Sequence, residues 1–285
     1  MKAMILAAGR GTRVQPLTNT LAKPMLPILG IPVMELIILR LKENGFKDIV
    51  INTAYLSETI EDYFKNGEEI GVNISYSFEG SIHNGIREGK AVGSAAGMKK
   101  IQIENSFFDD TFLVICGDAI IDADLEQAIK LHKMRGGIAS ILLKEVPKSS
   151  VWKYGVVELS TSSKVVSFQE KPDINDARSN LVNTGIYIFE PEVLSYIPDI
   201  GNYDIGSDLF PKLVQNNVAI YGLNLPFQWI DIGTLNDYYN ANLMALNNKI
   251  NDIRFVKNEL HLDFVKRDIS THDANLNQCK VIKAG

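Results

Sequence analysis

Short apolar runs alternate with helical periodicities through the first half of the chain. Residues 3–8 and 112–116 are continuous apolar runs, typical of strands that are buried on both faces. In residues 32–44 apolar side chains recur every three or four positions, and Gly45 marks the end of the predicted helix. The predicted strands are 2–8, 48–52, 73–78, 111–116 and 138–143, and the predicted helices are 32–44, 57–64, 91–101 and 125–135. This alternation predicts an α/β fold with a mostly parallel central sheet and helices on both faces.

The rhythm changes after about residue 145. Residues 155–159 and 165–168 predict a hairpin, because the polar segment 160–164 separates two short apolar runs. Further strands are predicted at 183–189, 218–224 and 227–230, and further helices at 207–215 and 235–247. This mixed pattern predicts an extension of the same sheet, so that residues 1–247 form one domain. Residues 248–285 have weaker periodicity and are expected to be a C-terminal tail or the start of an appended segment.

Composition and charge narrow the classes of protein. The chain has 285 residues, of which 46% are hydrophobic and 22% charged, as in soluble globular proteins. A net charge of −5 disfavours a nucleic-acid binder, whose affinity would depend on a basic surface. No apolar stretch approaches the roughly 20 residues that span a membrane, and no targeting segment precedes the first strand. Two cysteines form no disulfide framework, so we expect a cytoplasmic protein without nucleic-acid or membrane partners.

A loop with two glycines and two arginines follows the first predicted strand. In the segment Gly9-Arg10-Gly11-Thr12-Arg13 the glycines allow backbone N–H groups to approach a ligand, and the arginines can neutralise phosphate oxygens. The segment is not a Walker A loop, because no Gly-Lys-Ser/Thr follows at the required spacing. It is not a Rossmann fingerprint either, because Val14 stands where a third glycine is needed. Taken alone, this pattern indicates a tight turn as readily as a phosphate site.

The same loop, combined with Lys23-Pro24-Met25-Leu26-Pro27, resembles the signature of the sugar-1-phosphate nucleotidyltransferases, also called NDP-sugar pyrophosphorylases. The resemblance continues over roughly 230 residues. Its further segments are Gly93-Ser94-Ala95, Gly117-Asp118, Glu170-Lys171-Pro172, Asn183-Thr184-Gly185-Ile186-Tyr187 and Trp229-Ile230-Asp231-Ile232-Gly233-Thr234. The resemblance implies a Rossmann-like fold of the nucleotide-diphospho-sugar transferase type. It also implies that residues 1–247 are a nucleotidyltransferase catalytic domain and that the protein forms a homo-oligomer.

The resemblance also implies roles for single residues. Arg13, Lys23 and Asp118 would be catalytic, and Asp118 and Asp231 would hold Mg²⁺, a cation that prefers oxygen ligands. The residues implied at the nucleotide are Leu6, Ala7, Ala8, Gly9, Gly11, Thr12, Arg13, Glu79, Gly93 and Ser94. Those implied at the sugar phosphate are Gly155, Glu170, Lys171 and Asn183.

Simpler interpretations exist for the acidic residues. Asp118 follows a strand, where an aspartate usually belongs to a turn, and Asp231 could cap a helix that starts near Thr234. Glu170 could be an ordinary surface carboxylate. Cys116 is expected to be an inert thiol buried in the core strand.

The segment 79–90 is longer than the usual connection to the Gly93-Ser94 loop, and this is where the family reads the base. Glu79 could accept hydrogen bonds from guanine N1–H and its amino group, or from N3–H of uracil or thymine. Because Gly80, Gly85 and Gly89 lie in the segment, it could also be a flexible surface loop. The base therefore stays open at this point.

We predict transfer of a nucleotidyl group from a nucleoside triphosphate to a hexose-1-phosphate, with release of pyrophosphate. Many guanylyltransferase-like members append a β-helical domain, and no six-residue steps of such a domain occur here. This slightly favours glucose-1-phosphate with UTP or dTTP over the alternative, a mannose-1-phosphate guanylyltransferase that uses GTP.

Two rival classes remain. A glycosyltransferase could use Asp122-Ala123-Asp124 as an Asp-x-Asp metal motif, although acids directly before a predicted helix at Leu125 commonly cap it. A non-catalytic regulatory homologue would bind a sugar nucleotide without turning it over. Such homologues usually lack a charged catalytic group, and all of these groups are present here.

Overall fold

The computed structural model describes residues 1–251. A nine-stranded mixed sheet forms its centre, with the strand order β12-β11-β13-β8-β1-β4-β5; β10 also pairs with β13, and β14 pairs with β10. The parallel part consists of β1 (Lys2–Leu6), β4 (Asp48–Thr53), β5 (Asn73–Phe78) and β8 (Phe112–Cys116). In these strands Leu6 is the register partner of both Asn52 and Cys116, so the carboxyl ends of three strands meet at one edge.

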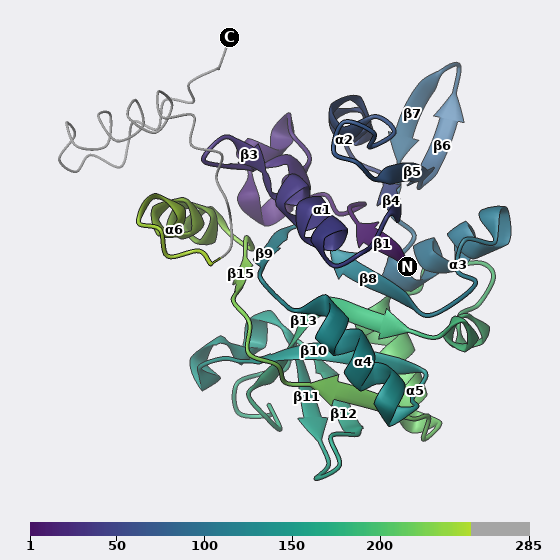
Figure 1. Cartoon of the computed structure of the whole chain (residues 1–285), viewed down its shortest axis with the longest axis vertical. Coiled ribbons are helices and arrows are strands. Elements are labelled where there is room, and N and C mark those ends of the chain that lie inside the picture. The colour runs from purple at the N-terminus through teal and green to yellow at the C-terminus, as the bar shows by residue number, and fades with distance from the viewer. Residues whose placement is uncertain (252–285) are drawn as a thin grey trace. The chain divides into compact units, whose positions relative to one another are not determined.

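The second half of the chain extends this sheet, as the sequence predicts. Strand β13 (Leu181–Phe189) runs antiparallel to β8 and connects the two halves (Figure 1). Its other neighbours are β10 (Ala139–Glu145) and β11 (Gly155–Leu159), and β14 (Ile220–Leu223) and β12 (Val165–Glu170) complete this side. The predicted Rossmann-like mixed sheet with helices on both faces is confirmed.

Alternate side chains of a strand point to opposite faces of the sheet and pack against the helices there. Met4 and Ile5 of β1 are both fully buried. Met4 belongs to the same core cluster as Met98 of α3, whereas Ile5 and Met34 of α1 both lie next to Gly117 on the other face. Burial of each such side chain contributes about 1.5–3 kcal/mol. The helices are α1 (Val33–Glu43), α2 (Ser57–Phe64), α3 (Ser94–Asn105), α4 (Leu125–Arg135), α5 (Phe210–Gln215) and α6 (Leu235–Leu246).

Helix α3 starts three residues later than predicted. Gly93 has φ +94, a left-handed conformation that glycine adopts without strain, and the helix begins immediately after it. The predicted helix 207–215 is a π-helical turn, Ile205–Leu209, that continues into α5. Short 3₁₀ turns occur at Thr12–Val14, Leu17–Asn19, Lys23–Met25, Lys148–Lys153 and Pro191–Tyr196.

The segment considered as a flexible loop is a hairpin. Strands β6 (Gly80–His83) and β7 (Ile86–Gly89) pair around Asn84 and Gly85, which both have positive φ. Arg87 fixes the hairpin to α2 through a 2.7 Å ion pair with Glu61. Two further small sheets join β2 (Pro27–Ile28) to β3 (Ile31–Pro32), and β9 (Ala119–Ile121) to β15 (Trp229–Asp231).

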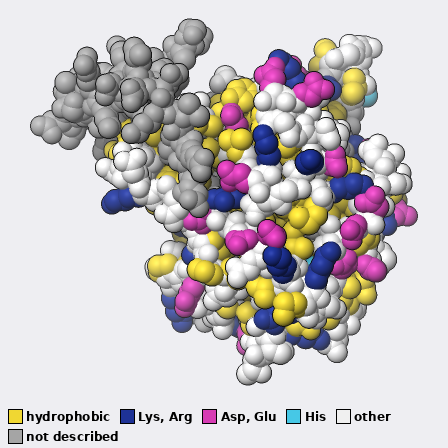
Figure 2. Space-filling model, in the orientation of Figure 1, with side chains coloured by type: hydrophobic (Ala, Val, Ile, Leu, Met, Phe, Trp, Pro, Cys, Tyr) yellow, Lys and Arg dark blue, Asp and Glu magenta, His cyan; other side chains and the backbone are white. Residues whose placement is uncertain are grey.

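Residues 1–251 form one compact unit. The predicted boundary after residue 247 stays a prediction, because residues 252–285 lie outside the described part of the chain. On the face that Figure 2 shows, basic and acidic side chains are interspersed. Among residues 1–251, no helix is both long enough and apolar enough to cross a membrane.

Candidate active site

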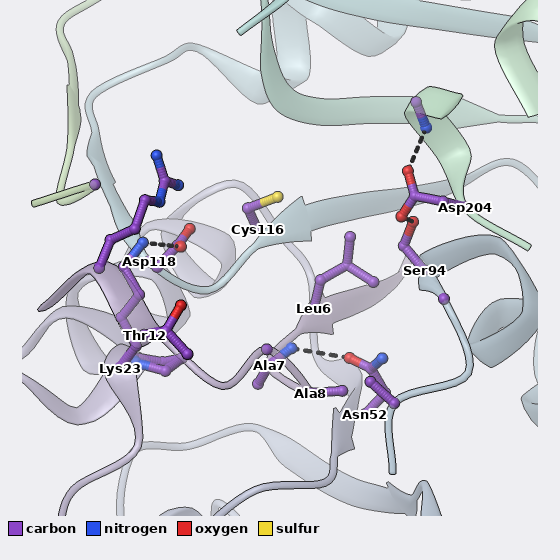
Figure 3. A pocket seen from close by; sticks show the side chains of 18 of the residues that line it. Leu6, Ala7, Ala8, Thr12, Lys23, Asn52, Ser94, Cys116, Asp118 and Asp204 are labelled. Atoms are coloured by element: carbon purple, nitrogen blue, oxygen red, sulfur yellow. Dashed lines mark hydrogen bonds and ion pairs between the residues drawn. The ribbon is translucent and has the colours of Figure 1, made fainter. Parts of the chain in front are cut away.

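A cavity of about 540 Å³ opens where β1 and β8 end. In open α/β sheets this carboxyl edge is the usual place for a ligand. Lys23 and Asp118 lie on one side of the cavity, and Ser94 and Asp204 lie on the opposite side (Figure 3). The predicted residues that line it are Leu6, Ala7, Ala8, Gly9, Gly11, Thr12, Arg13, Lys23, Glu79, Gly93, Ser94, Asp118, Glu170, Lys171 and Asn183.

The remaining two predicted residues, Gly155 and Asp231, are not part of the lining but lie next to it. Gly155 is the register partner of Glu170 on the neighbouring strand, and a Cβ at Gly155 would lie 3.0 Å from Glu170 Oε2. Asp231 directly precedes Ile232 and the lining residue Gly233, and Ile232 N donates to the carbonyl oxygen of Asp118 at 3.4 Å. The fold therefore brings together residues that are spread over more than 200 positions.

Gly11 has a packing role in the loop after β1. Its φ is +65, and a Cβ there would lie 2.9 Å from Lys23 Cβ. Thr18 Oγ1 donates to the carbonyl oxygen of Gly11 at 2.8 Å. The missing side chain thus lets the loop pack against the aliphatic part of Lys23. A Cβ at Gly9, in contrast, would meet no atom within 4 Å.

Three charges of mixed sign gather beside this loop. Lys23 Nζ lies 2.5 Å from Asp118 Oδ2, and the lysine side chain is only 10% exposed. Asp231 is brought close by the pairing of β15 with β9, where it is the register partner of Ala119. Burial, together with the negative charge of Asp118, raises the pKa of Asp231 to about 6. Two neighbouring carboxylates, one of them buried, repel each other when both are ionised, and such a pair is typical of a site that binds a cation.

Asp231 does not cap a helix, whereas the two aspartates of the Asp-x-Asp motif have structural partners. Thr234 caps α6, since its Oγ1 accepts from Asp237 N at 3.2 Å. Asp124 caps α4 by accepting from Gln127 N at 2.8 Å. Asp122 accepts from the backbone N–H of Gln228. The Asp-x-Asp motif is therefore part of the scaffold, and the glycosyltransferase interpretation loses its metal site.

Glu170 and Lys171 lie at the end of β12. Lys171 has φ +44, which is uncommon for a residue with a side chain. Its backbone N donates to the carbonyl oxygen of Tyr154 at 3.1 Å, and its Nζ lies 3.1 Å from Glu170 Oε1. The Lys171 side chain is 57% exposed and lines the cavity, so it is available to an anionic ligand.

Asn183 is fixed by its own strand. Its Nδ2 donates to Tyr187 Oη and its Oδ1 accepts from Gly185 N, both at 2.9 Å. Gly185 has φ +77, and a Cβ there would lie 2.5 Å from Cys116 Sγ. Cys116, expected only as a core thiol, also borders the cavity, and burial raises the pKa of its thiol.

Sequence reasoning missed several residues of the cavity. Asp204 accepts from Ser94 Oγ at 2.7 Å and from Gly206 N at 2.8 Å, and therefore joins the start of α3 to the π-helical turn on one side of the cavity. Its only signal was its position shortly before the predicted helix 207–215. The other missed lining residues are Val14, Pro24, Asn52, Ala91, Cys116, Tyr187, Gly206 and Gly233.

Parallel strands, a glycine-containing loop and the cationic side chains of Arg13, Lys23 and Lys171 are typical of α/β proteins that bind phosphorylated ligands. Comparison with known proteins agrees with this class. The chain belongs to the nucleotidyl transferase family, whose model matches residues 2–268.

Relatives and solved structures give further comparisons. The chain is 53% identical over 254 residues to "UTP--glucose-1-phosphate uridylyltransferase" of Synechocystis sp., covering 89% of this chain and 66% of that protein. It is 30% identical to "Mannose-1-phosphate guanylyltransferase" of Mycobacterium tuberculosis, covering 83% and 62%. The chain thus spans about two thirds of the length of these relatives.

A crystal structure of a putative glucose-1-phosphate thymidylyltransferase from Bacillus anthracis has a TM-score of 0.73 and 25% identity, covering 90% of this chain and 97% of that one. UDP-glucose pyrophosphorylase complexed with UDP-glucose has a TM-score of 0.71 at 24% identity, covering 87% and 98%. The likeness to the second structure shows that this chain has the same fold as that protein.

Proposed function

We propose that this protein transfers a uridylyl group from UTP to glucose-1-phosphate, giving UDP-glucose and pyrophosphate. The observation that carries the proposal is that one cavity holds Lys23 and Asp118 at one side and Glu170, Lys171 and Asn183 at another. The similarity to the Synechocystis uridylyltransferase supports uracil and glucose over guanine and mannose. The related activity with dTTP is the nearest alternative for the base.

The reaction needs charge neutralisation and positioning more than covalent chemistry. An oxygen of the sugar phosphate attacks the α-phosphorus, the bond to the leaving pyrophosphate breaks, and no protein nucleophile is required. Both reactants are anions that repel each other. In the proposed arrangement Lys23 stabilises charge at the α-phosphate, Arg13 and the loop amides bind the pyrophosphate, and Lys171 orients the attacking phosphate.

Asp118 and Asp231 fit a magnesium ion. Mg²⁺ is usually held by one or two carboxylates together with substrate phosphates and water. Within residues 1–251, no group of three or more His, Cys, Asp or Glu could hold a metal by itself. These two aspartates would therefore hold the ion only together with the nucleotide, and the ion would supply charge neutralisation at the phosphates.

Pyrophosphate release tests the proposal. The assay combines UTP, dTTP, GTP, CTP or ATP with glucose-, mannose- or galactose-1-phosphate in the presence of Mg²⁺. We expect the highest kcat/KM for UTP with glucose-1-phosphate. Asp118→Asn should lower kcat by about a hundredfold or more. Asp124→Asn is the matched control, because asparagine caps a helix as well as aspartate does.

Two results would contradict this proposal. Release of pyrophosphate only with GTP and mannose-1-phosphate would favour the guanylyltransferase alternative. No release with any pair, while UTP still binds, would favour a regulatory homologue. A cytoplasmic location and a homo-oligomeric state also stay proposals, to be tested by fractionation and by light scattering.

A further inference from the structure

Glu79 lies at the cavity, but its carboxylate is already engaged by the protein. The side chain belongs to a residue that is only 1% exposed. Its Oε1 accepts from Asn52 Nδ2 at 2.7 Å, and its Oε2 accepts from Val92 N at 2.9 Å. A Cβ at Gly97 would lie 2.3 Å from Oε1, so the backbone of α3 covers the carboxylate from a third direction.

Asn52 links Glu79 to the loop after β1 through a second hydrogen bond. Its Oδ1 accepts from Ala7 N at 2.9 Å, and both atoms are buried (Figure 3). Leu6 and Asn52 are register partners, so the side chain of Asn52 takes the place of the next ladder acceptor at the end of β1. The two hydrogen bonds also determine which end of the Asn52 amide is oxygen. The direction in which Ala7 and Ala8 leave the strand therefore depends on Asn52.

We infer that Glu79 and Asn52 are positioning residues for nucleotide binding, and that Glu79 does not read the base. This inference rests on the proposed function and refines it. Glu79 holds the amide of Asn52, which holds the N–H of Ala7, and it also holds Val92 directly before Gly93 and Ser94. One buried carboxylate thus fixes the positions of two backbone segments that line the cavity, the loop after β1 and the segment before α3.

UTP and CTP distinguish positioning from base reading, because uracil has a donor at N3 and cytosine has an acceptor there. The measurements are kcat/KM for UTP and the inhibition constant of CTP against UTP. A positioning role predicts that Glu79→Gln and Asn52→Ala each lower kcat/KM for UTP and raise the inhibition constant of CTP by the same factor, up to about a hundredfold. Since both residues act through one chain of contacts, the double variant should lose much less than the product of the two single losses.

A matched pair on the same two strands provides the control. Asn73 Nδ2 donates to Asp48 Oδ1 at 2.8 Å, at the opposite ends of β4 and β5, and this pair is exposed. Asn73→Ala removes a similar amide–carboxylate hydrogen bond and should leave both constants unchanged. Thermal unfolding of every variant verifies that the comparison is made on folded protein.

Opposite shifts would overturn the inference. If Glu79→Gln weakened UTP but tightened CTP, the side chain would contact N3 of the base. Wild-type kinetics in Asn52→Ala would show that the loop needs no support from this pair. If the wild-type protein released no pyrophosphate, the proposed function would fail. Calorimetric binding of UTP and CTP to the same variants would then test the inference separately, and losses that differ between the nucleotides would overturn it.

Discussion

Lys23 combines a packed aliphatic stem with a charged end. Its Cβ and Cγ lie against Gly11, and its Nζ pairs with Asp118 in a setting that excludes most solvent. Charges act strongly in such surroundings, because water screens them little. The same side chain therefore supports the loop and supplies the charge, and a test of its catalytic role has to separate the two.

Lys23→Met separates them, since methionine preserves the stem and removes the ammonium group. We expect kcat to fall by about a hundred- to a thousandfold, the usual loss on removing a group that stabilises transition-state charge. Calorimetry should show that UTP still binds. Lys130→Met, at a side chain that is 68% exposed on α4, is the control and should leave kcat unchanged. A wild-type kcat in Lys23→Met would exclude the proposed role.

At the scale of elements, Asp204 links segments that are far apart in the sequence. It joins Ser94, at the start of α3, to the π-helical turn Ile205–Leu209. Ser94 Oγ in turn accepts from Ile205 N at 2.9 Å. Gly93 fits closely against this connection, because a Cβ there would lie 2.5 Å from the carbonyl oxygen of Tyr203. The start of α3 and the π-helical turn, which both contribute residues to the cavity, are thus held at a fixed spacing.

Asp204→Ala should loosen that spacing. We expect KM to rise for both substrates and kcat/KM to fall by about ten- to a hundredfold, since small displacements of positioned groups are costly. Losing the cap should also reduce the free energy of unfolding by about 1 kcal/mol. Steady-state kinetics and urea unfolding measure the two effects. Asp124→Ala, which removes a comparable cap on α4, should show only the second. If KM rose for one substrate alone, Asp204 would belong to that subsite.

At the scale of the whole molecule, a buried polar network joins elements away from the cavity. His132 of α4 is 1% exposed; its Nδ1 lies 2.8 Å from Ser140 Oγ of β10 and its Nε2 lies 3.0 Å from Glu190 Oε1. Thr111, just before β8, donates to the same carboxylate at 2.9 Å. Burial lowers the pKa of His132, although its hydrogen bond with Glu190 opposes the shift. Ser140 is completely buried, so this Ser–His–Glu arrangement is structural.

This network predicts loss of stability in acid. Burial holds the pKa of His132 in the folded protein below 6.5, the ordinary value to which it returns in the unfolded chain. The unfolded state then binds more protons, so the free energy of unfolding falls as pH falls below 6.5, by at most about 1.4 kcal/mol per pH unit for one group. Urea unfolding between pH 5 and pH 8 measures the slope.

Substitution identifies the group responsible for that slope. His132→Gln should flatten the dependence, whereas His83→Gln on the exposed hairpin should preserve it. An unchanged slope in His132→Gln would assign the acid sensitivity to other groups.

The sequence by itself determined the parallel α/β framework and the segments that meet at its edge. Continuous apolar runs such as 3–8 and 112–116 are typical of buried strands, and parallel strands place the loops that follow them at one edge. Positions 80–89 carried a signal too, because Asn84-Gly85 is a strong hairpin turn, but the glycines suggested a loop.

Only the tertiary structure decided what individual polar side chains do. Asp118, Asp122, Asp124 and Asp231 are alike in sequence, yet the structure shows two in the scaffold and two beside Lys23. From the sequence Glu79 could contact the base, whereas its burial and its hydrogen bonds with Asn52 and Val92 favour a positioning role. Hydrophobic burial follows a local period that can be read along the chain. The Asn52–Glu79 and Ser94–Asp204 hydrogen bonds join residues 27 and 110 positions apart, and no local pattern encodes them.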